Sequence, residues 1–209
     1  MKNIKILLII LLSYSTVSCR KEPLTKIENP DFSRAYPLQI GNYWIYRSTI
    51  LFKNGFVQRF ETTDSVWIDR DTVINRKLYW VKKSSVHGSE LLTDSSGTIL
   101  LKSKDEHYAI FNKKNYKDTI LRTAAFRRIM ADINEEVNVV AGTFKTISCK
   151  TLMKMGSDHQ HMEDFPIHDF DFHLHDQTLF ANEVGIVKRI SYFLGNKTEE
   201  NLEKYYIKK

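Results

Sequence analysis

Hydrophobic and polar residues alternate one by one along most of this sequence. The alternation is clearest at residues 43–52, where Trp44 and Tyr46 fall on one face of an extended segment, and it ends at Asn54-Gly55. Successive side chains of a β-strand point to opposite faces of its sheet, and Asn-Gly is the strongest short signal for a tight hairpin turn. The pattern therefore predicts a β-hairpin whose second strand occupies residues 56–63.

The same alternation recurs in short segments to the end of the chain. Further strands are predicted at residues 65–69, 78–83, 90–93, 98–102, 108–111, 136–140, 144–153, 170–175, 185–193 and 202–207. Residues 123–133 instead place Ala125, Ile129 and Ile133 at intervals of four, which predicts a helix. Short strands rich in Tyr, Phe, Val and Ile are typical of antiparallel sheets. We therefore expect a mainly β fold, an antiparallel sheet forming a half-closed barrel or sandwich, with at most one or two short helices.

The first residues of the chain follow a different pattern. Two lysines precede an unbroken apolar run at residues 6–12, and small polar residues then lead to Cys19. This order is typical of a secretory signal, and the run is much shorter than the ~20 residues that span a bilayer. The sequence therefore predicts a signal peptide at residues 1–18, a lipidated cysteine and tether at residues 19–34, and a single β-rich domain at residues 35–209.

The residues before Cys19 indicate which kind of signal this is. Thr16-Val17-Ser18-Cys19 resembles the lipobox of bacterial lipoproteins, in which the cysteine is acylated and cleavage occurs just before it. The resemblance implies that Cys19 carries fatty acyl chains such as palmitate, which would hold the protein on a membrane of the cell envelope, expected to be the outer membrane. Cys149 would then be the only thiol left, so we expect no intrachain disulfide and a buried structural role for Cys149.

Three further segments resemble a known family. Residues 36–46 read YPLQIGNYWIY, residues 141–146 read AGTFKT and residues 180–188 read FANEVGIVK. They are similar to the PLxxGNxWxY, AGTFxT and VGxVK motifs of a group of uncharacterised envelope lipoproteins, especially from Bacteroidota. The resemblance implies a β-rich, membrane-tethered domain, and it carries over no catalytic residue.

The same motifs have a structural interpretation. Gly41 suits a tight turn before the first strand, Gly142 suits a hairpin turn, and Gly185 would let a neighbouring chain or ring approach closely. Trp44 and Tyr46 would place two large rings on one face of their strand. These rings either pack in the core or line a ligand cleft, and the sequence leaves both interpretations open.

Charge and sequence signatures argue against several classes of function. The formal net charge is +6, and it falls to +4 without the two lysines of residues 1–18. The basic residues are scattered, which indicates a solvated surface and not a nucleic-acid site. The sequence contains no G-x-S-x-G, P-loop, G-x-G-x-x-G or H-E-x-x-H signature, so no catalytic residue is predicted.

A histidine-rich stretch at residues 159–176 is the candidate metal site. Alternation places His173 and His175 on the polar face of a predicted strand, and His159 and His161 share the same spacing near the end of the preceding strand. Four imidazoles on adjacent strands could bind Zn²⁺ or Cu²⁺. The stretch fits neither cupin nor metallo-hydrolase spacing, so adventitious metal affinity and an inert polar face are the alternatives.

These observations lead to one main hypothesis and two alternatives. We expect a lipid-anchored, non-enzymatic envelope lipoprotein that acts as a binding or assembly component, attached to a membrane through its N-terminal lipid and binding no nucleic acid. One alternative is a metal-binding protein that uses the histidine stretch, with Zn or Cu as the only cofactor expected. The other is a carrier of a small apolar ligand inside the half-closed barrel, suggested by 10 Tyr, 12 Phe and 3 Trp residues.

Overall fold

The computed structural model describes residues 32–114, 118–154, 167–169 and 172–209. The predicted signal peptide, Cys19, most of the predicted tether, His159 and His161 lie outside these ranges. Within the ranges the chain forms strands, turns and loops, and no residue is helical.

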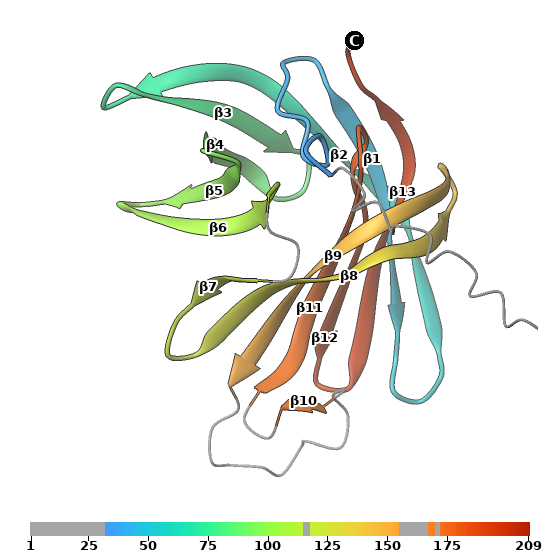
Figure 1. Ribbon diagram of the computed structural model, residues 1–209. Coiled ribbons are helices and arrows are strands. Elements are labelled where there is room, and N and C mark those ends of the chain that lie inside the picture. Colours follow the sequence, from blue (N-terminus) through green and yellow to red (C-terminus); the bar gives the residue numbers. More distant parts are fainter. Residues whose placement is uncertain (1–31, 115–117, 155–166, 170–171) are drawn as a thin grey trace, which may run out of the picture.

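Thirteen strands form one antiparallel sheet in the described part of the chain (Figure 1). They are β1 (Tyr43–Leu51), β2 (Val57–Ile74), β3 (Lys77–Ser84), β4 (Gly88–Ser95), β5 (Thr98–Ser103), β6 (Glu106–Asn112), β7 (Thr119–Arg122), β8 (Phe126–Val139), β9 (Gly142–Lys154), β10 (Ile167–Asp169), β11 (Phe172–Ala181), β12 (Gly185–Phe193) and β13 (Asn196–Tyr206). Their order across the sheet is β6-β5-β4-β3-β2-β1-β13-β12-β11-β9-β8-β7, with β10 paired to β11. Most strands therefore lie beside their neighbours in sequence, as expected of successive hairpins.

The sheet curls until its two ends approach each other. Arg128 on β8 donates a hydrogen bond from Nη1 to the backbone carbonyl of Ala109 on β6, at 2.9 Å. β6 and β7 are the two ends of the strand order, and no ladder of backbone hydrogen bonds joins them. The mainly β, half-closed barrel predicted from the sequence is therefore confirmed.

The helix predicted at residues 123–133 is wrong. Most of that segment belongs to β8, which pairs with β7 on one side and β9 on the other. A spacing of four residues is also a multiple of two, so Ala125 and Ile129 fit the period of a strand as well as that of a helix. Pairing with two neighbouring strands selects the strand, because tertiary contacts override local propensity.

The N-terminal part of the described chain lies inside the barrel. Phe32, Ala35 and Tyr36 are buried among residues of β4, β5, β6, β8, β9 and β11. The centroid of the Tyr36 ring lies 6.3 Å from that of Phe111 on β6 and 5.8 Å from that of Phe180 on β11. This segment therefore fills the space between the two halves of the curled sheet, and its aromatic burial stabilises the half-closed shape.

A buried asparagine holds the turn that precedes β1. Gly41 has a φ of 93°, as the predicted tight turn requires. Asn42 is fully buried; its Nδ2 donates to the carbonyl of Pro37 at 3.0 Å, and its Oδ1 accepts from the backbone N of Lys208 at 2.8 Å. One side chain thereby ties the start of β1 to the residues that follow β13, with both of its polar atoms hydrogen-bonded.

Two aromatic side chains of β1 reach across β13 to the region where β12 begins. Trp44 Nε1 donates to the carbonyl of Val184 at 2.5 Å, and the Tyr46 hydroxyl donates to the carbonyl of Ile186 at 2.9 Å. Gly185 stands between these two residues with a φ of 99°, and a Cβ added there would lie 3.3 Å from Trp44 Nε1. The close approach predicted at Gly185 is therefore confirmed.

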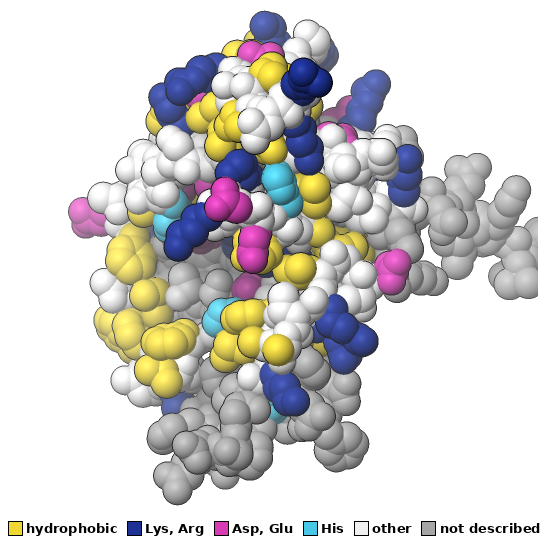
Figure 2. Space-filling model, turned by 90° about the vertical axis from the view of Figure 1, so that its left-hand side faces the viewer, with side chains coloured by type: hydrophobic (Ala, Val, Ile, Leu, Met, Phe, Trp, Pro, Cys, Tyr) yellow, Lys and Arg dark blue, Asp and Glu magenta, His cyan; other side chains and the backbone are white. Residues whose placement is uncertain are grey.

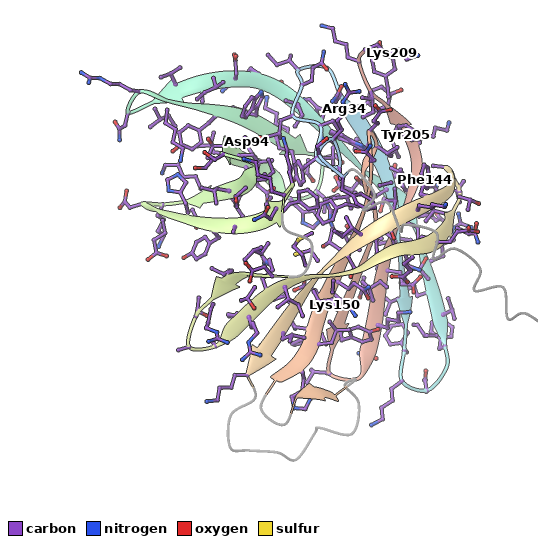
Figure 3. All side chains as sticks on the ribbon, viewed as in Figure 1. Arg34, Asp94, Phe144, Lys150, Tyr205 and Lys209 are labelled. Atoms are coloured by element: carbon purple, nitrogen blue, oxygen red, sulfur yellow. The ribbon has the colours of Figure 1, made fainter. Side chains whose placement is uncertain are left out.

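The β8–β9 hairpin folds over β13. Gly142 at its turn has a φ of 141°, and the backbone N of Ala141 donates to the carbonyl of Leu202 on β13 at 3.1 Å. The ring of Phe144 lies against that of Tyr205 on β13, with centroids 6.1 Å apart (Figure 3). The hairpin turn predicted at Gly142 is confirmed, and the hairpin adds a second layer over this part of the sheet.

Replacing Gly185 by alanine should destabilise the fold more than replacing Gly55 by alanine. Both glycines have positive φ angles, 99° and 84°, so each replacement costs about 1–2 kcal/mol of backbone strain. A Cβ at Gly55 meets nothing within 4 Å, whereas one at Gly185 meets Trp44 and Pro37. We expect the overpacking to cost about 1–3 kcal/mol more. Denaturant unfolding measures the difference, and equal losses in the two variants would contradict a packing role for Gly185.

Candidate functional site

A cavity of about 290 Å³ lies inside the half-closed barrel. Ten strands contribute to its lining (β2–β6, β8, β9 and β11–β13), together with Tyr36 from the N-terminal segment. Its ionisable lining residues include Asp64, Lys82, His87, Glu90, Arg128, Asp176, Arg189 and Glu200. Figure 2 shows acidic, basic and histidine side chains gathered in the middle of one face of the molecule. Convergence of so many ionisable groups on one concave space is typical of a binding site.

Arg189 on β12 and Glu200 on β13 form an ion pair in the cavity wall. Arg189 Nη1 lies 2.6 Å from Glu200 Oε2, and the Arg189 guanidinium carbon lies 5.0 Å from the centroid of the Tyr46 ring. Burial raises the pKa of Tyr46, and the Arg189 guanidinium opposes that shift. Tyr46 therefore stays neutral and donates its hydrogen bond to Ile186. The ion pair and the cation–π contact together fix the position of Arg189.

Arg128 and Asp176 line another part of the cavity. Arg128 Nε donates to Thr151 Oγ1 at 3.1 Å, in addition to the Nη1 bond that joins β8 to β6. Burial raises the pKa of Asp176, while Arg128 and a hydrogen bond from Thr151 act in the opposite direction. Because the pKa of Asp176 rises overall, the loss of hydration on burial destabilises its carboxylate more than Arg128 and Thr151 stabilise it. Asp176 is therefore unfavourable for the fold at neutral pH.

Asp64 on β2 is a buried carboxylate with one unsatisfied oxygen. Its Oδ1 accepts hydrogen bonds from the hydroxyls of Ser84 and Ser85 at 2.7 and 3.1 Å. Its Oδ2 accepts none from any residue that the structure describes. His87 Nε2 lies 4.0 Å from this oxygen and 3.8 Å from Glu200 Oε1. Two carboxylate oxygens thus face one exposed imidazole at distances too long for hydrogen bonds.

Part of the cavity wall is apolar. Side chains from opposite parts of the sheet contribute to it, namely Val66, Leu101, Ile110, Phe180 and Ile186. The cavity therefore combines a hydrophobic wall with a few placed charges, the composition expected of a site for a small molecule.

The two aromatic residues considered as ligand-lining lie in the core beside this cavity. Trp44 and Tyr46 are both buried, and the void next to their rings measures only about 20 Å³. Tyr46 contributes to the site indirectly, because its ring packs against Arg189, which lines the cavity. Direct contact of either residue with a ligand stays a prediction.

The strand predicted at residues 170–175 is confirmed from Phe172 on, where β11 begins, and Phe170 lies outside the described residues. A short strand, β10, pairs antiparallel with β11, with Asp169 opposite Phe172. His173 and Leu174 are both buried although they are adjacent, and a register shift between Leu174 and Asp176 interrupts the alternation. Burial of His173 therefore argues against an inert solvated face at this position, which was one of the alternatives for the histidine stretch.

The two described histidines of the candidate metal site lie on β11 next to β9 and β8. His173 is opposite Met153 of β9 in the strand register, and the centroid of the His175 ring lies 6.4 Å from that of Phe126. β9 and β11 are adjacent, as expected for the two predicted strands. The described ranges contain no group of three or more His, Cys, Asp or Glu side chains that could hold a metal ion. Since His159 and His161 lie outside those ranges, the four-histidine site stays a prediction.

Cys149 is buried on β9, as expected. Burial raises the pKa of its thiol to about 12, so the reactive thiolate is scarce at neutral pH. This agrees with a structural role for Cys149.

The charged lining of the cavity was not predicted from the sequence, where the scattered basic residues indicated a solvated surface. A usable signal was present in β11, where Asp176, Thr178 and Phe180 occupy alternate positions and all line the cavity. For Arg189 and Glu200 no such signal exists, because their inward direction depends on how β12 and β13 pair within the curled sheet.

No helix in the described ranges is long and apolar enough to cross a membrane.

Comparison with known proteins shows that the fold occurs in a solved bacterial structure. The sequence matches no protein-family model and no curated protein. A candidate lipoprotein from Parabacteroides distasonis shares the fold. It is 13% identical, with a TM-score of 0.50, and the alignment covers 85% of this chain and all of that one.

Two other structures align over similar lengths. A candidate exported protein with a YmcC-like fold from Bacteroides fragilis gives a TM-score of 0.48 at 12% identity, over 82% of this chain and 98% of that one. A LolA superfamily protein from Nitrosomonas europaea gives a TM-score of 0.25 at 6% identity, over 86% of this chain and 91% of that one. At these identities the likeness to the Parabacteroides protein concerns the fold alone.

Replacing Asp176 by asparagine should stabilise the protein at neutral pH. A carboxyl whose pKa is raised by folding favours the folded state below its ordinary pKa of about 3.8, and this contribution is lost as the pH rises. Asparagine carries no charge to desolvate, so the melting temperature should rise at pH 7, and the gain should shrink as the pH falls toward 4.

Asp69→Asn is a control for which the opposite change in stability is expected. A hydrogen bond from Lys83 lowers the pKa of Asp69, so its contribution is present at neutral pH and is lost on acidification. Asp69→Asn should therefore lower the melting temperature at pH 7. A destabilising effect of Asp176→Asn at pH 7 would show that Arg128 outweighs the burial cost.

Proposed function

We propose that this protein is a lipid-anchored, non-enzymatic lipoprotein of the bacterial outer membrane that acts as a binding component. The lipobox-like sequence that ends at Cys19 supports the anchor, and so does the shared fold with the candidate lipoprotein from Parabacteroides distasonis. The three sequence motifs support membership of the Bacteroidota-type lipoprotein group.

The observation that carries the binding role is the charged cavity inside the half-closed barrel. Its volume of about 290 Å³ suits a small molecule. An apolar ligand is a poor match, because it would leave Asp64 Oδ2 without a hydrogen bond, at a cost of about 1–3 kcal/mol for an unsatisfied group, and would further desolvate the charged side chains in the wall. The cavity therefore favours binding of a small ligand with polar or charged groups. It does not favour the alternative role, in which the barrel carries an apolar ligand.

An unsatisfied carboxylate oxygen indicates which charge the ligand carries. Asp64 Oδ2 accepts no hydrogen bond from the described residues, and it and Glu200 Oε1 lie 4.0 and 3.8 Å from the same His87 Nε2, while Arg189 and Lys82 already pair with Glu200 and Glu90. An ammonium group supplies up to three donors and a positive charge, so it suits two such acceptors. The cavity is accordingly proposed to bind a small organic amine whose apolar part lies against the hydrophobic wall.

The non-enzymatic role is supported by the state of the candidate reactive groups. Burial keeps the Cys149 thiol protonated. The cavity cations Arg189 and Lys82 are engaged in ion pairs. Such groups recognise charge more readily than they transfer protons or attack a substrate.

The lipid anchor is tested by metabolic labelling with radioactive palmitate in a bacterial host that processes lipoproteins. The wild-type protein should incorporate label and fractionate with membranes, because Cys19 is the acylated residue. Cys19→Ala should lose the label. Cys149→Ala is the matched control and should keep it, since the Cys149 thiol is buried. Label retained by Cys19→Ala would refute the anchor.

The amine site is tested by calorimetry with 2-phenylethylamine and its neutral analogue 2-phenylethanol. The amine should bind about 10-fold or more tightly than the alcohol, because hydrogen bonds to charged groups contribute about 1.5–3 kcal/mol. Asp64→Asn should remove most of this preference. Asp71→Asn, an exposed position on the same strand, should retain it. Equal affinities for amine and alcohol, or no binding of either, would contradict the proposed ligand class.

A further inference from the structure

Two hairpin tips of the barrel expose large hydrophobic side chains. The β1–β2 tip exposes Leu51 to 41%, Phe56 to 60% and Val57 to 55%, and the β12–β13 tip exposes Phe193 to 67% and Leu194 to 64%. Single exposed apolar residues are ordinary, but a group of five on neighbouring turns is not. We call these five residues the apolar tips.

The two tips form one surface. Leu51 pairs with Val57 on one side and with Lys197 of β13 on the other. The backbone N of Lys53 donates to Asn196 Oδ1 at 3.3 Å, so the two turns are also joined directly. Both turns lie at the same end of the sheet, the lower end in Figure 1. A partner that covers one tip therefore covers the other.

The two turns themselves carry lysines and no acidic residue. Lys53 lies in the first turn and Lys197 follows the second, where it pairs with Glu199, and residues 51–58 and 193–198 contain no Asp or Glu. Aromatic and aliphatic side chains flanked by lysines are the composition of surfaces that enter the interface of a bilayer with anionic headgroups.

The length of the tether is compatible with a membrane at this end. The described chain begins beside the start of β12, where Arg34 hydrogen-bonds Asn182 and Glu183, and the tips lie at the far end of that strand. A nine-residue strand is about 30 Å long. The twelve residues 20–31 can span up to about 40 Å. Cys19 can therefore reach the plane of the apolar tips.

From these observations we infer that the apolar tips are a second membrane contact, which inserts into the same bilayer as the acyl chains of Cys19. The inference rests on the proposed lipid anchor for its choice of partner. Phe56, Phe193 and Leu194 would enter the interfacial region, and Lys53 and Lys197 would lie at the level of the headgroups. The barrel would then stand on the membrane on its hairpin tips instead of hanging freely from the tether.

The test places an environment-sensitive NBD fluorophore on the tip through Leu194→Cys in the full-length protein. The native thiol at Cys149 competes poorly for the label, because it is buried and burial raises its pKa to about 12. Peptide mapping confirms the labelled position. With vesicles of zwitterionic and anionic phospholipid, the emission at position 194 should shift to the blue and should be quenched by spin-labelled lipid.

Two matched positions serve as controls. Val140, 72% exposed at the β8–β9 turn, should remain in a polar environment. Ile40 is exposed at the opposite end of β1. A label there should shift to the blue only if the barrel contacts the membrane through that end. A blue shift at Ile40 in place of Leu194, or no shift at Leu194, overturns the inference, and the second result favours a protein partner for the tips.

The same samples separate this inference from the lipid anchor. Palmitate incorporation reports the anchor, whereas the NBD signal reports the tips. If no palmitate is incorporated, the labelling is carried out in the Cys19→Ala background, so that no free Cys19 thiol takes the label. The vesicles are still presented to the protein, and an unshifted label at position 194 then rejects the tips on its own. A double substitution, Phe193→Ser with Leu194→Ser, should reduce binding of the non-acylated Cys19→Ala protein to anionic vesicles, and Val140→Ser should not.

Discussion

The half-closed shape of this protein depends on two hydrogen bonds that cross the sheet, from Trp44 to the carbonyl of Val184 and from Tyr46 to the carbonyl of Ile186. β1 and β12 are not neighbours, since β13 lies between them. Side chains can bridge that distance only where the sheet is strongly curved and the opposing strand carries no side chain. Gly185 supplies that opening, since a Cβ there would meet the Trp44 indole. The curvature brings β6 toward β8 and so creates an interior.

The cavity follows from the same arrangement. The Tyr46 hydroxyl donates a hydrogen bond to the carbonyl of Ile186. The Arg189 guanidinium lies over the Tyr46 ring and forms an ion pair with Glu200. Inward charges are costly in a small barrel, and the raised pKa of Asp176 shows that the cost is only partly offset. A sheet built solely for stability would place apolar residues at these positions. The presence of charged residues there is the physical basis for the proposal that the interior binds a ligand.

The two ends of the barrel have different chemistry, and this gives the molecule a direction. One end is occupied by Phe32, Ala35 and Tyr36, which fill the interior, and by Asn42, which ties β1 to the C-terminal residues. The other end carries the apolar tips. A barrel that stood on those tips would hold its cavity at a fixed height above the membrane, so a ligand could be received or passed on near the bilayer surface.

The sequence by itself determined the features that depend on near neighbours: the period-two strands, the turns at Asn54-Gly55 and Gly142, the need for glycine at position 185, and the antiparallel, half-closed sheet. The helix expected at residues 123–133 failed because a spacing of four fits both periods, and pairing with β7 and β9 decided between them. The strand expected at residues 170–175 is confirmed from Phe172 on, where β11 begins, whereas the short strand β10 that pairs with it leaves no mark on local alternation. Only the tertiary structure decided which charged residues face the interior. Arg189, Glu200 and Asp64 are ordinary strand residues in the sequence, and curvature and register, which are set by contacts between residues far apart in the chain, turn them toward one cavity.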